Sequence, residues 1–169
     1  MPYTLTELAA DIRETLAAGA DRGAKEKVCA LVSRALRDEA FVATHLKDRA
    51  AGANPREVLY EDPDLGFCIC GHVYNGKALG SPHDHGPAWA IYGQAVGVTE
   101  MTDWRIVQQG GGAEPTLVEP QRTYLMHPGD AHLYDVGDVH SPKRDAPTKL
   151  IRIEGRNLDR INRSNIKAA

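Results

Sequence analysis

His83-Asp84-His85-Gly86-Pro87 and, further along the chain, Gly137-Asp138-Val139-His140 are the most informative patterns in this sequence. In a β-strand alternate side chains point to the same face, so a His-x-His pair places two imidazoles side by side. A third histidine, on a strand that folds back beside the pair, completes a set of three neutral nitrogens for a divalent metal. The sequence therefore predicts a metal site inside a small β-barrel, with His83, His85 and His140 as its ligands.

The pair also has a simpler interpretation, as surface histidines or as buried histidines bonded to backbone carbonyls. Two neighbouring features of the sequence favour the interpretation as a metal site. Gly86-Pro87 leads into an apolar, glycine-punctuated stretch at 89–97, and the turn Pro128-Gly129-Asp130 comes before a short strand that precedes His140. Such turns bring strands back side by side, as the site requires.

The length of 169 residues is that of one domain, and we expect a single domain over residues 1–169. Acids and bases are mixed along a chain of net charge −3, which argues against nucleic-acid binding. No apolar run approaches the roughly 20 residues that cross a bilayer, and Met1-Pro2-Tyr3-Thr4 lacks the pattern of a signal peptide. Three cysteines suit a reducing compartment, so we expect a cytoplasmic protein with no membrane partner.

The first part of the chain is predicted to be a helical layer, residues 1–50. One apolar stripe at three-four spacing runs from Leu5 to Leu16, Thr4 and Glu7 resemble a capping box, and Gly19 ends this helix. A second helix is expected over 24–38, and 41–46 either continues it or adds a short turn.

The second part, residues 56–158, is predicted to form an antiparallel β-barrel. Short segments rich in β-branched and aromatic residues alternate with Gly, Pro, Asn and Asp, which is typical of a barrel or sandwich. The expected strands are 58–60, 67–74, 89–98, 101–107, 116–119, 123–126 and 150–154. We expect Trp89 and Trp104 in the core.

These patterns resemble the cupin superfamily, whose first motif is a His-x-His strand ending in Gly and whose second runs Pro-Gly-Asp, a strand, then Gly-x-x-His. The resemblance implies a mainly β fold, a double-stranded β-helix or jelly-roll barrel. Most cupins add a Glu ligand four or five residues after the pair, where this chain has Trp89 and Ala90. The sequence is therefore most similar to the three-His branch, and within it to thiol dioxygenases of the cysteine dioxygenase type, which also have a helical layer before the barrel.

Gly-Asp-x-His occurs twice in the second motif, ending at His132 and at His140. In the cupin pattern the ligand follows the glycine after the strand that Pro-Gly-Asp begins. The resemblance thus implies His140 as the ligand, with His132 structural or at the pocket rim.

Two positions depart from the thiol dioxygenases. The family tyrosine near the end of the strand after the third histidine is replaced by Glu154, and the cysteine to which it is crosslinked in some members is replaced by Ala90. The crosslink is therefore absent. Tyr92, Tyr134 or Tyr74 would have to substitute for the tyrosine.

Strand parity places Cys68, Cys70, His72 and Tyr74 on one face, which in the resembling enzymes lines the site. His72 and Tyr74 are candidate substrate contacts, as is Tyr92. For the two cysteines we favour inert buried thiols over contacts or a Cys-x-Cys-x-His metal site.

Three charged residues are candidates for substrate binding or catalysis. Arg152 and Glu154 share a face of the last strand, either in the pocket or exposed. The resemblance implies an arginine on the strand entering the barrel that binds the substrate carboxylate, and Arg56 lies within a residue of that place. Arg56 or Arg152 can do this, because a guanidinium grips a carboxylate with two parallel hydrogen bonds.

The resemblance implies an Fe(II)-dependent dioxygenase, with one Fe(II) per chain, that oxidises a small thiol-bearing carboxylate to its sulfinate with O2. Nickel or zinc can occupy such a site on purification. His72, Arg152 and Glu154 are the candidate catalytic residues. One alternative is a three-His cupin with non-thiol chemistry, such as a C–C-cleaving dioxygenase, lyase or isomerase, and another is a metal-binding cupin without catalysis.

Overall fold

The computed structural model describes residues 3–169; of the Met1–Thr4 segment, the first two residues lie outside the described part. The helical layer consists of α1 (Leu5–Leu16), α2 (Arg22–Leu36) and α3 (Glu39–His45). The predicted capping box of Thr4 and Glu7 is present. Helix α2 begins two residues earlier than predicted because the Asp21 side chain caps it, and α3 is a separate helix capped by Asp38.

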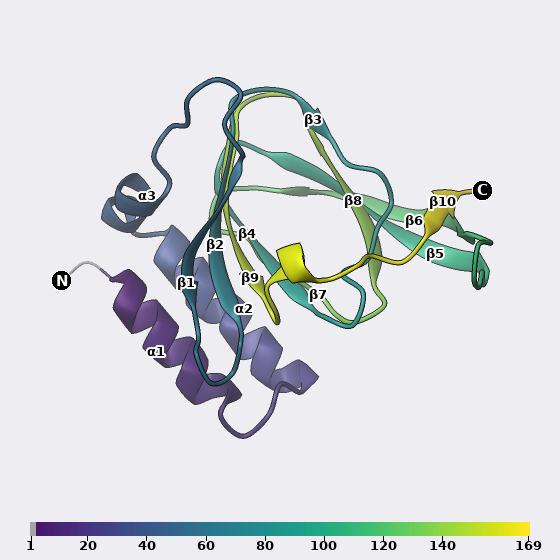
Figure 1. Ribbon diagram of the computed structural model, residues 1–169. Helices are drawn as coiled ribbons and strands as arrows, with labels where there is room; N and C mark the ends of the chain where they lie inside the picture. The colour runs from purple at the N-terminus through teal and green to yellow at the C-terminus, as the bar shows by residue number, and fades with distance from the viewer. Residues whose placement is uncertain (1–2) are drawn as a thin grey trace.

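The strands form two five-stranded sheets that face each other, a double-stranded β-helix arrangement (Figure 1). The first sheet contains, in order, β1 (Arg56–Glu61), β2 (Cys68–Tyr74), β9 (Thr148–Glu154), β4 (Ala90–Val96) and β7 (Ala131–Tyr134). The second contains β10 (Ile166–Ala168), β6 (Thr116–Met126), β5 (Thr99–Gln108), β8 (Val139–Arg144) and β3 (Ala78–Leu79). Every pairing is antiparallel except that of β10 with β6, and a short 3-10 helix, η1 (Leu158–Arg160), follows β9.

Helices α1 and α2 cover the outer face of the first sheet (Figure 1). Val32 of α2 belongs to one apolar core with Ile91 and Ile151 of the sheet. The contact is close at Gly93, where an added Cβ would lie 2.5 Å from Cγ1 of Val32. The alternate residues of the same strands face the space between the sheets. This alternation places Tyr92 and Arg152, which are register partners, inside the barrel.

Two predictions about the strands and one about the core were wrong in detail. The segments expected at 116–119 and 123–126 form one strand, because a bulge at Gln121 next to Pro120 lets pairing with β5 continue. The His83–His85 segment is not a strand but a loop between β3 and β4, in which His83 alone forms a bridge. Trp104 is half-buried and donates to Ser141 Oγ at 2.9 Å, whereas Trp89 lies in the core as expected.

Within residues 3–169, none of the helices has the length and apolar character needed to span a bilayer.

Candidate metal centre

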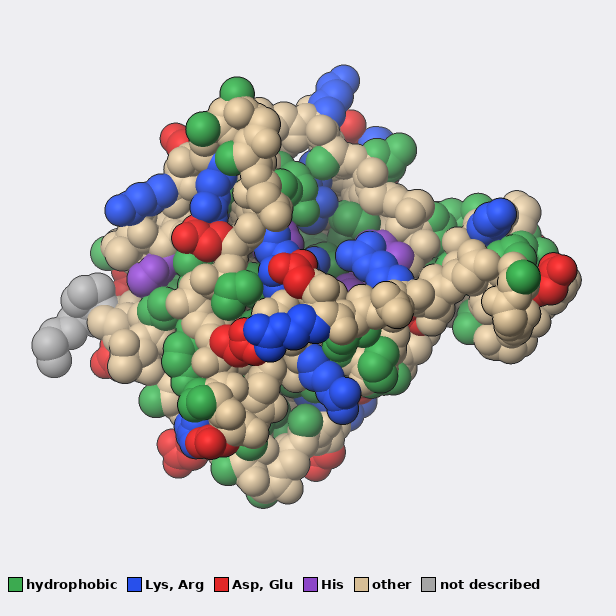
Figure 2. Space-filling model, in the orientation of Figure 1, with side chains coloured by type: hydrophobic (Ala, Val, Ile, Leu, Met, Phe, Trp, Pro, Cys, Tyr) green, Lys and Arg blue, Asp and Glu red, His purple; other side chains and the backbone are tan. Residues whose placement is uncertain are grey.

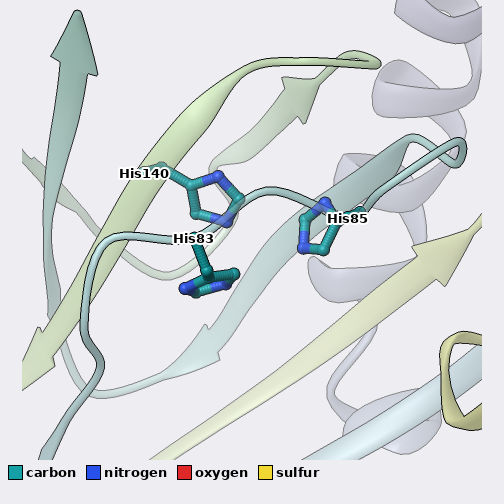
Figure 3. A group of neighbouring side chains, drawn as sticks. All are labelled: His83, His85 and His140. Carbon is teal, nitrogen blue, oxygen red and sulfur yellow. The ribbon is translucent and has the colours of Figure 1, made fainter. Parts of the chain in front are cut away.

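Three buried histidines converge between the two sheets. His83 and His85 come from the loop before β4, and His140 from β8, with one candidate ligand atom from each lying within 4.8 Å of the others. Figure 3 shows the three rings directed toward a common space. In the described part of the chain this is the one group of His, Cys, Asp or Glu side chains arranged to hold a metal.

Backbone pairing and a turn place the two loop histidines. His83 and His140 exchange two backbone hydrogen bonds of 3.0 Å, which fixes the loop against β8. The chain then turns at Gly86, whose φ of +58° favours glycine. Between the histidines, Asp84 accepts hydrogen bonds from Gly86 N at 3.0 Å and from Ser164 N at 3.1 Å and Oγ at 2.6 Å. Asp84 therefore ties the loop to the C-terminal segment.

Hydrogen bonds distinguish the Nε2 atom of His83, which has no protein partner among the described residues, from those of His85 and His140. Nδ1 of His83 donates to the carbonyl oxygen of Ser81 at 2.8 Å, so its Nε2 carries the lone pair, and this buried atom has no partner in residues 3–169. Nε2 of His85 and of His140 both face the Tyr92 hydroxyl, at 3.1 and 3.3 Å. An unpartnered buried ring nitrogen is costly unless a ligand occupies it.

The environment keeps all three rings neutral. Burial lowers the pKa of His83 to about 4 and that of His85 to about 3, and it holds the pKa of His140 well below its usual value. Neutral imidazoles are good ligands for iron, zinc, copper and nickel. This donor set therefore fits a divalent transition metal.

His132 lies outside the group. Its ring packs against those of Tyr124 and Tyr134, with centroid distances of 5.2 and 4.8 Å. The structure thus brings His140, and not His132, together with His83 and His85.

Among the three tyrosines considered as substitutes for the family residue, Tyr92 places its hydroxyl nearest the histidines. The Tyr134 ring stacks on His140 at 3.9 Å, but its hydroxyl bonds to that of Tyr124 at 2.7 Å. Tyr74 lies further out, with its hydroxyl 3.5 Å from Nδ1 of His72.

A cavity of about 180 Å³ opens beside His83. That volume corresponds to about six water molecules, so it suits a small ligand. The predicted contacts His72, Tyr74, Tyr92 and Arg152 all line it. Figure 2 looks onto this side of the molecule, where histidine atoms show in a hollow between blue basic side chains.

Arg56 and Glu154 are in contact with each other and do not line the cavity. Arg56 bonds to both Glu154 oxygens, at 3.1 and 2.7 Å, and also pairs with Asp159. Glu154 also accepts from Arg152 Nε at 2.8 Å. Burial opposes its charge, but Arg56 and Arg152 lower the pKa of Glu154 to about 2. Arg152 is therefore the one of the two predicted arginines that is placed to reach a ligand.

The structure does not bring Cys68 and Cys70 together with a histidine as a metal site. Both thiols are buried, and burial raises the pKa of Cys68 to about 11 and that of Cys70 to about 12. They remain protonated near neutral pH, as inert thiols would.

Sequence reasoning missed two arginines that line the cavity, Arg144 and Arg163. Arg144 is buried at the end of β8, where its guanidinium lies over the Tyr74 ring at 4.3 Å. Its even spacing from His140 on one strand was a usable signal, because it places both side chains on one face. Arg163 lies beside Ser164 in irregular chain, and no periodic pattern marks it.

No protein-family model matches this chain, and no curated protein matches it significantly. Solved structures of similar fold include KdgF from Halomonas sp., with a TM-score of 0.49 and 17% identity over 68% of this chain and 94% of the other. An uncharacterised protein with a double-stranded β-helix domain from Klebsiella pneumoniae has a TM-score of 0.49 and 14% identity, covering 74% and 88%. A cupin superfamily protein from Desulfitobacterium hafniense has a TM-score of 0.43 and 11% identity, covering 72% and 84%.

Proposed function

We propose that this protein is an Fe(II)-dependent dioxygenase that oxidises a small thiol-bearing carboxylate to its sulfinate. The observation that carries the proposal is a buried group of three neutral histidines, without a carboxylate, beside a small arginine-lined cavity. Three protein ligands on one side leave the other side of an ion open to substrate and O2.

His83, His85 and His140 would hold the iron through Nε2. When bound, the iron would supply a meeting point for the thiolate and O2 and allow electrons to pass between them. The reaction balances as RSH + O2 → RSO2H, in which sulfur gives up four electrons and both oxygen atoms enter the product. The thiol proton remains with the sulfinic acid or passes to solvent.

The protein's own side chains orient the substrate. Arg152 reaches the Tyr92 hydroxyl at 3.4 Å and is held from behind by Glu154, so its guanidinium has little freedom. A fixed guanidinium beside the histidines would bind the carboxylate and direct the rest of the molecule toward them. Glu154 acts as a positioning residue in this scheme.

The test begins with anaerobic Fe(II)-loaded protein mixed with cysteine, 3-mercaptopropionate, cysteamine and non-thiol acids. We expect new charge-transfer absorption with at least one thiol, then oxygen uptake equal to the sulfinate formed. Arg152→Met should weaken the apparent affinity about ten- to a hundredfold, and Arg56→Met should act only indirectly through Glu154. Absence of a response to every thiol would refute the proposal.

A lyase or isomerase reaction is the second candidate, and the position of Tyr92 favours it. A phenol within hydrogen-bond reach of two metal-facing histidines and of an arginine is placed to move a proton on a bound acid. Turnover of a non-thiol acid under strictly anaerobic conditions would support this candidate over the dioxygenase.

A further inference from the structure

We infer that the substrate carries two anionic groups, so that the site is built for a small dicarboxylic acid rather than a monocarboxylic one. This rests on the proposed function only in assigning the cavity to the substrate. The observation is an imbalance of charge: Arg144, Arg152 and Arg163 line the cavity, and no acidic residue of the described chain does.

The three arginines differ in how their charge is balanced. Arg152 pairs with Glu154, which lies behind it and is itself shared with Arg56, while Asp159 supplies a second carboxylate to Arg56. The charges of these two arginines and two carboxylates cancel, so Arg152 can offer a ligand hydrogen bonds through Nη1 but no unbalanced charge. Arg144 and Arg163, by contrast, form no ion pair with any residue from 3 to 169.

Arg144 is the cation that most needs a ligand of opposite charge, because it is buried. Only 4% of the residue is exposed, its Nε has no hydrogen-bond partner in the described chain, and its guanidinium lies over the face of Tyr74. An uncompensated buried charge is strongly destabilising, so such a charge is typical of a place where a ligand supplies the opposite charge. A carboxylate can accept two parallel hydrogen bonds from this guanidinium.

Arg163 supplies a second, independent cation at the mouth. The backbone next to it is fixed because Ser164 donates twice to Asp84, the residue between the two loop histidines. The arginine therefore approaches the cavity from the C-terminal segment, while Arg144 approaches from β8. A single carboxylate would pair with buried Arg144 and leave Arg163, which is exposed at the mouth, with solvent as its only partner in the described chain.

Binding of matched acids tests the inference without catalysis. Succinate and butyrate have the same chain length and differ by one carboxylate. Titration calorimetry on the metal-loaded full chain should give at least about tenfold tighter binding of succinate, as expected for one more charged pair. Arg144→Met and Arg163→Met should each remove most of this preference. Arg105→Met is the control, because Arg105 is exposed on β5 and pairs with Glu119.

Equal affinity for the two acids would overturn the inference, and so would an unchanged preference in both variants. Arg144→Lys keeps the charge and should retain part of the preference, which separates loss of the cation from a folding defect. Mercaptosuccinate and 3-mercaptopropionate, which also differ by one carboxylate, separate this inference from the proposed function. Equal oxidation of both thiols would refute the dianionic substrate but leave the proposed dioxygenase activity standing. If neither thiol is oxidised and succinate is still preferred, the dioxygenase activity is refuted and the dianionic substrate stands.

Discussion

The backbones of His83 and His140 bond to each other in both directions, each N–H donating to the other carbonyl oxygen at 3.0 Å. This pair of bonds joins a loop of irregular chain to β8, so the backbones of two of the three candidate ligands are held together independently of their rings. The site is therefore preorganised, and substitution of a ligand side chain should remove the metal without removing the fold.

Replacing both loop histidines should abolish metal binding. The double variant His83→Ala/His85→Ala leaves a single imidazole, which cannot hold a divalent ion against buffer. Metal analysis should find close to one divalent ion per chain in the parent and almost none in the variant. His45→Ala, on α3, is the matched control. Full occupancy of the double variant would show that the metal binds elsewhere.

The two copies of Gly-Asp-x-His should behave differently. His140→Ala removes a ligand and should empty the site. His132→Ala should keep most of the metal, because the His132 ring packs against Tyr124 and Tyr134 and lies outside the histidine group. Metal content and circular dichroism on both variants check this. The reverse pattern would mean that His132 is the true ligand.

Tyr92→Phe should separate chemistry from metal binding. The change removes a hydroxyl that lies 3.1 Å from His85 and 3.4 Å from Arg152 and leaves the ring in place. We expect unchanged metal content and a loss of turnover of about a hundredfold if the phenol moves a proton. Tyr124→Phe, which removes the partner hydroxyl of Tyr134, is the control. Full turnover by Tyr92→Phe would exclude a role for this hydroxyl.

Glu154 should contribute pH-dependent stability. Its folded pKa of about 2 is below the ordinary value of 4.5, so the unfolded chain takes up the proton first as the pH falls. The contribution of Glu154 to the free energy of unfolding is complete above about pH 5 and is lost as the pH falls toward 2. The shift of its pKa corresponds to about 3 kcal/mol of stability. Denaturant unfolding should show Glu154→Gln less stable than the parent at pH 7, with the difference narrowing below pH 4.5. A difference that stays constant over this range would show that the carboxylate charge is not the cause.

Asp84 should hold the C-terminal segment on the metal loop. Asp84→Ala removes the acceptor of three hydrogen bonds and should destabilise the protein by about 1–3 kcal/mol. Limited proteolysis should then cut the chain near Ser164 more readily than in the parent. Ser164→Ala removes only the hydroxyl donor and should have a smaller effect. Equal protease resistance in all three proteins would contradict this role.

The local patterns of the sequence were sufficient for several features. The three histidines, the capped helical layer and most strands were readable, because ligand spacing, capping residues and alternation are properties of neighbouring residues. Even so, the His-x-His segment is a loop rather than a strand. This loop is held by the turn at Gly86, whose φ is positive, and by the contacts of Asp84 with Ser164, instead of by the hydrogen bonds of a β-sheet.

Which charges face the cavity without a partner was decided by the tertiary structure. Arg56 was as good a candidate as Arg152 from the sequence, but contact with Glu154 and Asp159 takes up its guanidinium. Arg144 and Arg163 come from β8 and from the C-terminal segment and meet only when the sheets close. The sequence gives the type and spacing of a charged residue, but the partner of that residue depends on long-range packing. The partner in turn determines whether the charge is free to bind a ligand.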